Sequence, residues 1–401
     1  MTSLRQSLRA ALRHGMRIGV SVLVRVVPSR RSVLIGLGQD DEDNGLVMAA
    51  RLADGSAGPV TMSCDDPGIV RPRLDAVAQA LGLDASAVRL VRKFGPADAY
   101  AFVTSRLVLY THGMYGSPAV AGRRVHVNLW HGSGPKWIGH GFFTQYMGAR
   151  YVVASARHWG RETARALEMS PDTALLTGNP RQDLLHVPVD RAVLHGWGLD
   201  PDRPVVVWMP TFRSSSVVGQ GTVTQGATVS GAMTSEPLMR RLIEEGTRAG
   251  VQFVVKTHPY DTDDWDSLPI TRLTSEDLWA HGLSIYRFLT LADGMLSDYS
   301  SVWVDYLALD RPIGLYCPDL DSYAADRGLN EPSMAVAAED LLITDADDVA
   351  RFVTAVSTGV VDLDGLARVR EALDYVPTDP SPSGVLVGEL MSLLDGARRT
   401  R

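Results

Sequence analysis

The sequence predicts an α/β protein built from two αβα domains in tandem. Apolar segments with strand character alternate with segments of helical periodicity, which indicates a parallel sheet covered by helices. The alternation restarts after a connection rich in Gly, Asp and Pro near residues 194–204, and 401 residues exceed one ordinary core. We therefore expect the two domains at residues 31–195 and 196–380. A segment stands at each end, covering residues 1–30 and 381–401.

The first half supplies the elements of one such domain. Strands are expected at residues 33–37, 60–63, 88–91, 107–110, 124–129 and 151–154, with helices after Asp43, at about 71–81 and up to about Met169. The segment LLTGNPRQDLL, residues 175–185, closes this half. Active sites of open α/β sheets lie beyond the carboxyl ends of the strands, so the loops there are the places to search.

The second half repeats the pattern. Strands are expected at residues 204–209, 252–256, 294–297 and 313–316, with helices at about 236–249, 302–309 and 385–397. The last helix has leucines on one side and fits either domain. A Gly-, Ser- and Thr-rich stretch at residues 214–235 is too long for a tight connection, so it is either a functional loop or disordered.

Composition indicates a soluble globular protein, with 45% hydrophobic and 21% charged residues. Cys64 and Cys317 lie far apart outside any CxxC or Cys/His pattern, which favours the cytoplasm. The acidic pairs at 261–263 and 319–321 have DxD spacing but are common in loops, so we expect no metal. Gly36-Leu37-Gly38 is followed by acidic residues and lacks the third glycine of a dinucleotide fingerprint. We expect no cofactor.

Residues 1–30 are basic within a chain of net charge −7. Four arginines recur every four residues beside a stripe of leucines, which gives a helix one cationic and one apolar face. These residues are Arg5, Arg9, Arg13 and Arg17, with Leu4, Leu8 and Leu12. Such a helix suits an anionic membrane surface through residues 1–28, and the alternative is packing on the protein's own domain. The acidic remainder argues against nucleic acid.

Residues 292–312, ADGMLSDYSSVWVDYLALDRP, place two hydroxyls, Ser300 and Ser301, where a strand turns into a helix. The first helical turn leaves N–H groups unpaired and carries the positive end of the helix dipole, so a phosphate is stabilised there without metal. The alternative is that Ser300 only caps the helix.

His131 follows another expected strand, in the sequence LWHGSG at residues 129–134. The glycines around it let a substrate approach closely. An imidazole is the usual base for removing a proton from an alcohol, although a single histidine is more often structural.

Two further strands of the second half end in groups that suit phosphate. Lys256 and His258 alternate in VVKTHP, and Thr211 and Arg213 lie in WMPTFR. Arg donates two hydrogen bonds at once to phosphate oxygens, although a surface salt bridge would also explain Arg213. Phosphate-compatible groups at three strand ends of one domain favour phosphate binding.

Taken together, NLWHGSGPKWIG, TGNPRQDLL, WMPTFR, VKTHP and LSDYSSVWVDYLALDRP, followed by DLDSYAADRG, resemble in order and spacing the motifs of the CDP-glycerol glycerophosphotransferase family, the teichoic acid primases and polymerases. The resemblance covers about residues 104–328. It implies a GT-B fold, in which two Rossmann-like domains face each other across a cleft, with the CDP donor bound by the C-terminal domain and the acceptor on the N-terminal side. It also implies peripheral association with the cytoplasmic face of the cell membrane.

The reaction implied is attack of a terminal hydroxyl on the glycerol-bearing phosphorus of CDP-glycerol or a similar CDP-polyol, with release of CMP. The acceptor would be a lipid-linked saccharide or a polyol-phosphate polymer. His131 is similar to the family's catalytic histidine and would act as base, and His258 is similar to the second essential histidine and would stabilise the leaving phosphate. The expected substrate-binding residues are Gly132, Ser133, Lys136, Thr211, Arg213, Lys256, Asp298, Ser300, Ser301 and Asp305.

Three positions depart from the family pattern and concern the acceptor: Trp137 stands where a lysine is common, Ser133 where a threonine is frequent, and Leu329 where an aromatic residue is usual. Two other functions stay open. A nucleotide-sugar glycosyltransferase or epimerase of the same fold would act on a UDP-sugar, and a non-catalytic CDP-binding scaffold would bind donor without either histidine. Glycerol or ribitol as the polyol, and primase or polymerase as the activity, are equally open.

Overall fold

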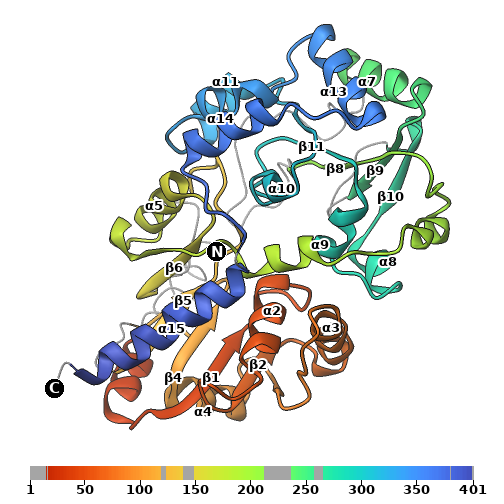
Figure 1. The fold of residues 1–401 in the computed structure, drawn as a ribbon. Coiled ribbons are helices and arrows are strands. Elements are labelled where there is room, and N and C mark those ends of the chain that lie inside the picture. Colours follow the sequence, from red (N-terminus) through yellow and green to blue (C-terminus); the bar gives the residue numbers. More distant parts are fainter. Residues whose placement is uncertain are drawn as a thin grey trace, which may run out of the picture.

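The computed structural model describes residues 15, 17–118, 123–138, 149–211, 236–256, 265–379 and 381–399. Two domains, each with a parallel sheet covered by helices, stack one above the other in Figure 1. This is the α/β architecture that the alternation of strands and helices predicted.

The N-terminal domain contains a seven-stranded sheet in the order β3-β2-β1-β4-β5-β6-β7. Its strands are β1 (Arg30–Gly36), β2 (Val60–Cys64), β3 (Arg89–Arg92), β4 (Ser105–Tyr110), β5 (Val125–Asn128), β6 (Tyr151–Ala154) and β7 (Ala174–Leu176). All neighbours are parallel. The central strands are apolar and buried, as expected for a sheet covered on both faces.

The C-terminal domain contains a five-stranded parallel sheet in the order β10-β9-β8-β11-β12. Its strands are β8 (Val205–Met209), β9 (Gln252–Lys256), β10 (Ile270–Leu273), β11 (Gly294–Ser297) and β12 (Ile313–Leu315). Successive strands are added on opposite sides of β8: β9 and β10 lie on one side of it, and β11 and β12 lie on the other. Ligands of open α/β sheets bind at such a topological switch point.

Helices cover both sheets and join the domains. Besides the N-terminal helix discussed below, the α-helices in the described part of the chain are α2 (Asp43–Leu52), α3 (Pro67–Ala80), α4 (Pro96–Thr104), α5 (Arg157–Ala166), α7 (Pro237–Arg248), α8 (Ser275–Trp279), α9 (Ile285–Phe288), α10 (Val302–Tyr306), α11 (Leu320–Arg327), α12 (Met334–Ala337), α13 (Ala346–Thr358), α14 (Leu363–Leu373) and α15 (Pro382–Arg399). The 3₁₀ helices are η1 (Pro171–Thr173), η2 (Pro180–His186), η3 (Arg191–Trp197), η4 (Trp265–Ser267), η5 (Leu289–Leu291), η6 (Leu307–Leu309) and η7 (Glu339–Leu341).

The expected connection near residues 194–204 overlaps η3, which carries the chain from the first domain into the second. The last helix, α15, returns to the N-terminal domain (Figure 1), where the Arg51 Nε atom donates to Ser383 Oγ over 2.9 Å. Leu386 and Leu390 on its inner side are buried. The apolar stripe that fitted either domain therefore packs on the first.

The described end of the basic N-terminal segment is helical over residues 17–26. Val24 is buried beside Phe102 and Tyr110, and the buried Arg124 donates from Nε to the Val24 carbonyl over 2.8 Å and from Nη2 to the Val27 carbonyl over 2.7 Å. These bonds satisfy carbonyls that a helix leaves unpaired at its C-terminus. The expected amphipathic arginines at 5, 9 and 13, like the loop at 214–235, lie outside the described residues. Among the described helices, none has the length and apolar character of a membrane span.

The domains share a continuous apolar core. Trp159 of α5 in the first domain packs edge to face on Trp303 of α10 in the second, with ring centroids 5.6 Å apart, and the Trp159 indole donates to the Pro332 carbonyl over 3.0 Å. The contact fixes the carboxyl ends of the two sheets relative to one another.

Candidate functional site

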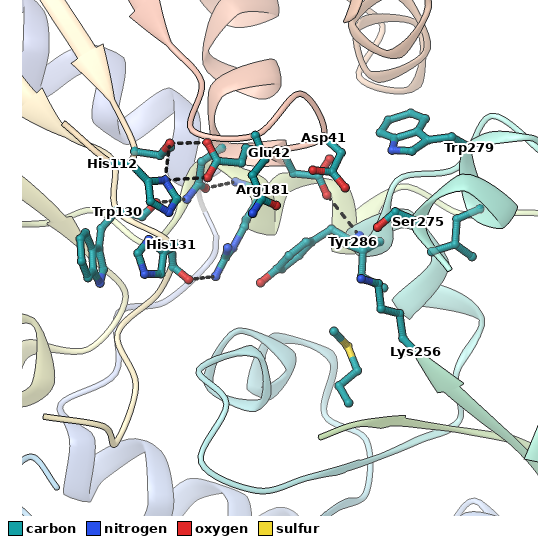
Figure 2. Close-up of a pocket in the computed structure, with 17 residues that line it drawn as sticks. Asp41, Glu42, His112, Trp130, His131, Arg181, Lys256, Ser275, Trp279 and Tyr286 are labelled. Carbon is teal, nitrogen blue, oxygen red and sulfur yellow. Dashed lines mark hydrogen bonds and ion pairs between the residues drawn. The ribbon is translucent and has the colours of Figure 1, made fainter. Parts of the chain in front are cut away.

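A cavity of about 310 Å³ lies between the two domains, bordered by the carboxyl ends of strands from both sheets. Loops after β4 and β5 contribute His112 and His131 to one wall, and the end of β9 contributes Lys256 to another. In Figure 2 the two imidazoles lie next to each other, and Lys256 lies on the far side of Arg181 and Tyr286. The structure thus brings together two of the predicted residues, His131 and Lys256.

His112 is held by an acidic partner at the start of α2. Its Nδ1 lies 3.0 Å from Glu42 Oε1, while Glu42 Oε2 accepts a 2.6 Å hydrogen bond from the Gly38 amide and another from the Thr111 hydroxyl. Burial disfavours the charged carboxyl, but the hydrogen bond and charge interaction with His112, together with the bonds from Thr111 and Gly38, bring the pKa of Glu42 below its ordinary value. Glu42 is therefore an ionised carboxylate beside an imidazole.

His131 sits between two aromatic rings. Its ring centroid is 3.9 Å from that of Trp130 and 4.8 Å from that of His112, and its shielded Nδ1 has no hydrogen-bond partner among the described residues. Its enclosure, followed by the nearby charge of His112, lowers the pKa of His131 to about 3. His131 is thus a neutral imidazole, and its ring is stacked between those of Trp130 and His112.

Arg181, from the TGNPRQDLL motif, connects the domains. Its Nη2 donates to the His131 carbonyl over 2.9 Å and to Asp305 Oδ2 over 2.7 Å. Asp305 is fully buried and also accepts from Asn179 Nδ2 over 2.8 Å and from the Tyr286 hydroxyl over 2.6 Å. Burial disfavours the guanidinium, but the neighbouring Tyr286 and Asp305 outweigh it and raise the pKa of Arg181. Arg181 therefore stays charged on the cavity wall.

Asp305 was expected to line the donor pocket. In the described structure it lies behind the cavity wall, where it anchors Arg181 instead of facing a ligand. Sequence spacing placed it correctly near the site but gave no information on which side of α10 it occupies.

The loop that carries His131 is strained and is held by both domains. Trp130 and Gly132 have positive φ angles of 51° and 121°. The Ser301 hydroxyl donates to the His131 carbonyl over 3.3 Å, and Asn44 Nδ2 donates to the Trp130 carbonyl over 3.0 Å. A Cβ added at Gly132 would lie 2.5 Å from Ser301 Oγ, so only glycine permits this approach.

Ser300 and Ser301 stand before α10, as expected. Ser301 occupies the N-cap position, yet its side chain makes no capping hydrogen bond, because its hydroxyl turns to the His131 loop. The Ser300 amide donates to Asp298 Oδ1 over 3.3 Å. Asp298 is fully buried and also accepts from the Thr211 amide over 2.9 Å and the Thr211 hydroxyl over 2.7 Å. Asp298 thus joins the ends of β8 and β11.

Ser133 and Lys136 lie in the continuation of the His131 loop. Ser133 is buried, and its hydroxyl accepts from the Ser155 amide over 3.2 Å. Lys136 forms an antiparallel bridge with Leu329 of the second domain. Around it, the Trp137 amide donates to the Gly328 carbonyl over 3.1 Å. Two of the positions that depart from the family pattern, 137 and 329, thus lie in one contact between the domains.

Burial lowers the pKa of Lys256, the cation of the C-terminal wall. The predicted residues His258 and Arg213 lie outside the described residues, as do the acidic positions 261–263. Of the second acidic pair, Asp319 Oδ1 accepts from the Tyr299 hydroxyl over 2.9 Å. Within the described part of the chain, no group of three or more His, Cys, Asp or Glu side chains is placed to hold a metal ion.

Sequence reasoning missed His112, Glu42, Arg181 and Tyr286 as residues of the cavity. A signal existed for His112, because Thr111-His112-Gly113 follows β4 as Trp130-His131-Gly132 follows β5. Glu42 lies in the acidic run after Gly36-Leu37-Gly38, and in the sequence this run indicates only that a dinucleotide is disfavoured there.

Comparison with known proteins agrees with this fold. The sequence model of the CDP-glycerol:poly(glycerophosphate) glycerophosphotransferase family matches residues 77–358. The teichoic acid ribitol-phosphate primase of Bacillus spizizenii is 26% identical over 281 residues, covering 63% of this chain and 66% of that protein. The teichoic acid glycerol-phosphate transferase of Staphylococcus aureus is 25% identical over 236 residues, covering 52% and 55%. The matches thus span between half and two thirds of these relatives.

The solved structure of the wall teichoic acid polymerase TagF superposes with a TM-score of 0.65 at 14% identity, covering 99% of this chain and 98% of that chain. This likeness confirms the expected fold of two facing Rossmann-like domains. Since the family model extends over well over half of the chain, this protein belongs to the CDP-glycerol:poly(glycerophosphate) glycerophosphotransferase family.

Proposed function

We propose that this chain transfers glycerol phosphate, or a related polyol phosphate, from a CDP-activated donor to a hydroxyl of a lipid-linked or polymeric acceptor, in the synthesis of a teichoic acid or a capsule-type polymer. The observation that carries the proposal is the cavity between the domains. It combines imidazoles on the N-terminal wall with the cations Arg181 and Lys256.

The proposed chemistry follows from the positions of the imidazoles and the cations in this cavity. The acceptor oxygen attacks the phosphorus that bears the polyol, the bond from that phosphorus to CMP breaks, and negative charge grows on the leaving phosphate. Lys256, together with Thr211, Arg213, Ser300, Ser301 and His258, would surround the diphosphate, and His131 would lie beside the attacking hydroxyl. The acidic residues on the N-terminal wall suit a hydroxyl-rich group better than a phosphate, which favours acceptor binding there. No metal or other cofactor enters the proposed reaction.

The test is incubation of the purified chain with CDP-glycerol or CDP-ribitol and a lipid-linked acceptor, followed by measurement of CMP and by mass spectrometry of the product. Relatives of both the ribitol and the glycerol type match this chain, so both donors are needed. His131→Ala and His258→Ala should each lower turnover at least ~100-fold. His186→Ala is the matched control, because that ring lies outside the cavity and contacts Thr378. Near-normal turnover of the two site variants would reject the assignment.

We also propose that the N-terminal helix holds the protein at the cytoplasmic face of the membrane. Ile18, Val22 and Val26 are exposed at helical spacing, on a segment that also carries Arg17 and Arg25. Deleting residues 1–28 would also remove the buried Val24, so replacing the three exposed residues with serine is the cleaner test. Binding to vesicles with anionic lipid should fall, whereas Val360→Ser, at an exposed site elsewhere, should leave it unchanged. Equal binding by all variants would contradict this role.

A further inference from the structure

We infer that the loop at residues 92–95 is a second membrane-docking element, which inserts the Phe94 ring into the surface of an anionic bilayer. This role rests on the membrane association proposed above for the N-terminal helix. It adds a residue from another part of the chain to that surface and sets the orientation of the protein on the lipid.

Phe94 is held in water in an unusual backbone conformation. Of the large apolar side chains in the described part of the chain, it is the most exposed, at 74%. It has a positive φ of 58°, which is rare for a bulky residue and persists only where the surroundings hold it. An exposed aromatic ring kept at the cost of backbone strain indicates a role outside the core.

The outward position of the ring is built into the domain. The Phe94 amide donates to Asp98 Oδ2 over 2.8 Å, and the Tyr115 hydroxyl donates to the same oxygen over 2.8 Å. Asp98 is fully buried. The Tyr115 ring contacts the Phe94 ring edge to face, with centroids 5.8 Å apart. A buried acid and an aromatic neighbour therefore fix Phe94 where it is.

The loop and the N-terminal helix lie against the same apolar cluster. Tyr115, which supports Phe94, packs against the cluster that contains Val24 of the helix. Next to Tyr115, a Cβ added at Gly116 would lie 3.2 Å from Arg17 Cβ, so the described start of the helix passes close to this support. The exposed apolar side chains of the helix therefore share a side of the N-terminal domain with Phe94. They are Ile18, Val22 and Val26.

The charge on this side suits an anionic lipid surface. Residues 17–31 carry four arginines and no acid, and residues 89–104 carry three basic residues and one acid, the buried Asp98. Two acids of the neighbouring loop after β2 offset part of this charge: Asp65 pairs with Lys93 over 2.6 Å, and Asp66 lies 4.0 Å from Arg92. An aromatic ring among basic side chains is typical of segments that bind the boundary between lipid headgroups and acyl chains.

The cavity lies next to this surface. The loop that follows β4 carries His112, which borders the cavity, and Tyr115, which supports Phe94, three positions apart. Docking at Phe94 thus places the cavity beside the plane in which a lipid-linked acceptor is held. Two contacts, the helix and the loop, fix an orientation on the membrane that the helix alone would leave free.

The first experiment measures docking without any substrate. An environment-sensitive fluorophore is attached to Phe94→Cys in a full chain that also carries Cys317→Ser, since Cys64 is buried and out of reach. We expect the emission to shift to the blue with vesicles of phosphatidylcholine and phosphatidylglycerol, and to stay near its value in buffer with phosphatidylcholine alone. The same label on Val360→Cys, at an exposed site of the second domain, should respond to neither vesicle. No shift at position 94, or an equal shift at position 360, would overturn the inference.

Unlabelled variants test the ring itself. Phe94→Ser should weaken binding to the anionic vesicles at least ~10-fold, the factor that corresponds to the low end of burying a phenylalanine side chain, and Phe94→Trp should retain binding. Both variants should melt near wild type because the ring is exposed, and Val336→Ser, at an exposed site in α12, should bind as wild type does. Equal binding by Phe94→Ser and wild type would reject the role of the loop. A change from dimer to monomer in Phe94→Ser without loss of vesicle binding would also reject it and would assign the ring to a second copy of this chain.

Turnover separates this inference from the proposed function. With an acceptor held in vesicles at limiting concentration, Phe94→Ser should release CMP at least ~10-fold more slowly than wild type, in line with its weaker binding. With a short-chain, water-soluble acceptor the two rates should be equal. An equal loss with both acceptors would overturn the inference, because the ring would then act on the site itself. Absence of CMP release by the wild-type chain with every CDP-polyol would reject the proposed function, whereas the vesicle experiments would still decide whether Phe94 docks.

Discussion

Replacing Asp305 with asparagine should destabilise the protein strongly, because it leaves the Arg181 guanidinium between the domains without its counter-charge. Asp305 is fully buried, and only 12% of the Arg181 side chain is exposed. Two of the hydrogen bonds to Asp305 come from Arg181, at 2.7 and 3.0 Å. Removing one member of such a buried pair typically costs about 3–5 kcal/mol.

The expected change in melting temperature follows from the size of the chain. An unfolding entropy of about 2.1 cal/mol/K per residue gives about 0.8 kcal/mol/K for 401 residues. A loss of about 3–5 kcal/mol therefore corresponds to a fall of about 4–6 °C, if the domains unfold together as their shared core suggests. Scanning calorimetry of wild type, Asp305→Asn, Arg181→Met and the double variant measures both the loss and the coupling.

The double variant distinguishes a charge effect from a general loss of packing. With both charges gone, its destabilisation should be smaller than the sum of the single effects by about 1–3 kcal/mol. Asp340→Asn, which breaks an exposed pair with Arg368, should produce a clearly smaller fall. A fall of less than about 1 °C for Asp305→Asn, or strict additivity, would refute the reasoning.

Three further predictions concern glycines and one buried acid. Gly38→Ala should reduce turnover, with melting near wild type, because the new Cβ would displace the His112 ring from the cavity wall. Gly132→Ala should lower both activity and melting temperature, whereas Gly388→Ala, whose Cβ meets nothing within 4 Å in α15, should lower neither. Burial raises the pKa of Asp43 from 3.8 to about 7, so the folded chain holds a proton that the unfolded chain releases. This contribution to stability is complete below about pH 4 and is lost as pH rises through about 7. The melting temperature of Asp43→Asn relative to wild type should therefore rise between pH 4 and 8, and parallel curves would contradict the assignment.

The elements with regular periodicity were predictable from the sequence. Residues 151–154 and 252–256 were expected as strands and form β6 and β9 with the same bounds. The buried strands of parallel sheets are short apolar runs, which stand out without any tertiary information. Elements without a continuous buried apolar run gave weaker signals. β10 (Ile270–Leu273) was missed because only its last residue, Leu273, is buried, and α9 (Ile285–Phe288) because it forms barely one helical turn.

The site was only partly predictable, because its contacts join residues that are distant in the chain. His131 and Lys256 carried local signals at strand ends, and both line the cavity. The pairing of His112 with Glu42 spans about 70 positions, and that of Arg181 with Asp305 spans 124. A sequence read alone marks such residues as polar and does not show which partner each one meets.

The conformation of the His131 loop depends on both domains, not on the N-terminal domain alone. Its carbonyl accepts hydrogen bonds from Arg181 and Ser301, and Arg181 in turn is fixed by Asp305 of the second domain. A backbone with positive φ on both sides of His131 has to be held by its surroundings. Separation of the domains would remove the contacts from Ser301 and Asp305 together, so the loop that carries His131 takes its described form only when the second domain is docked. Site assembly and domain docking are therefore one event in this fold, and variants at Ser301 or Asp305 should alter the His131 ring signals even though neither side chain touches that ring.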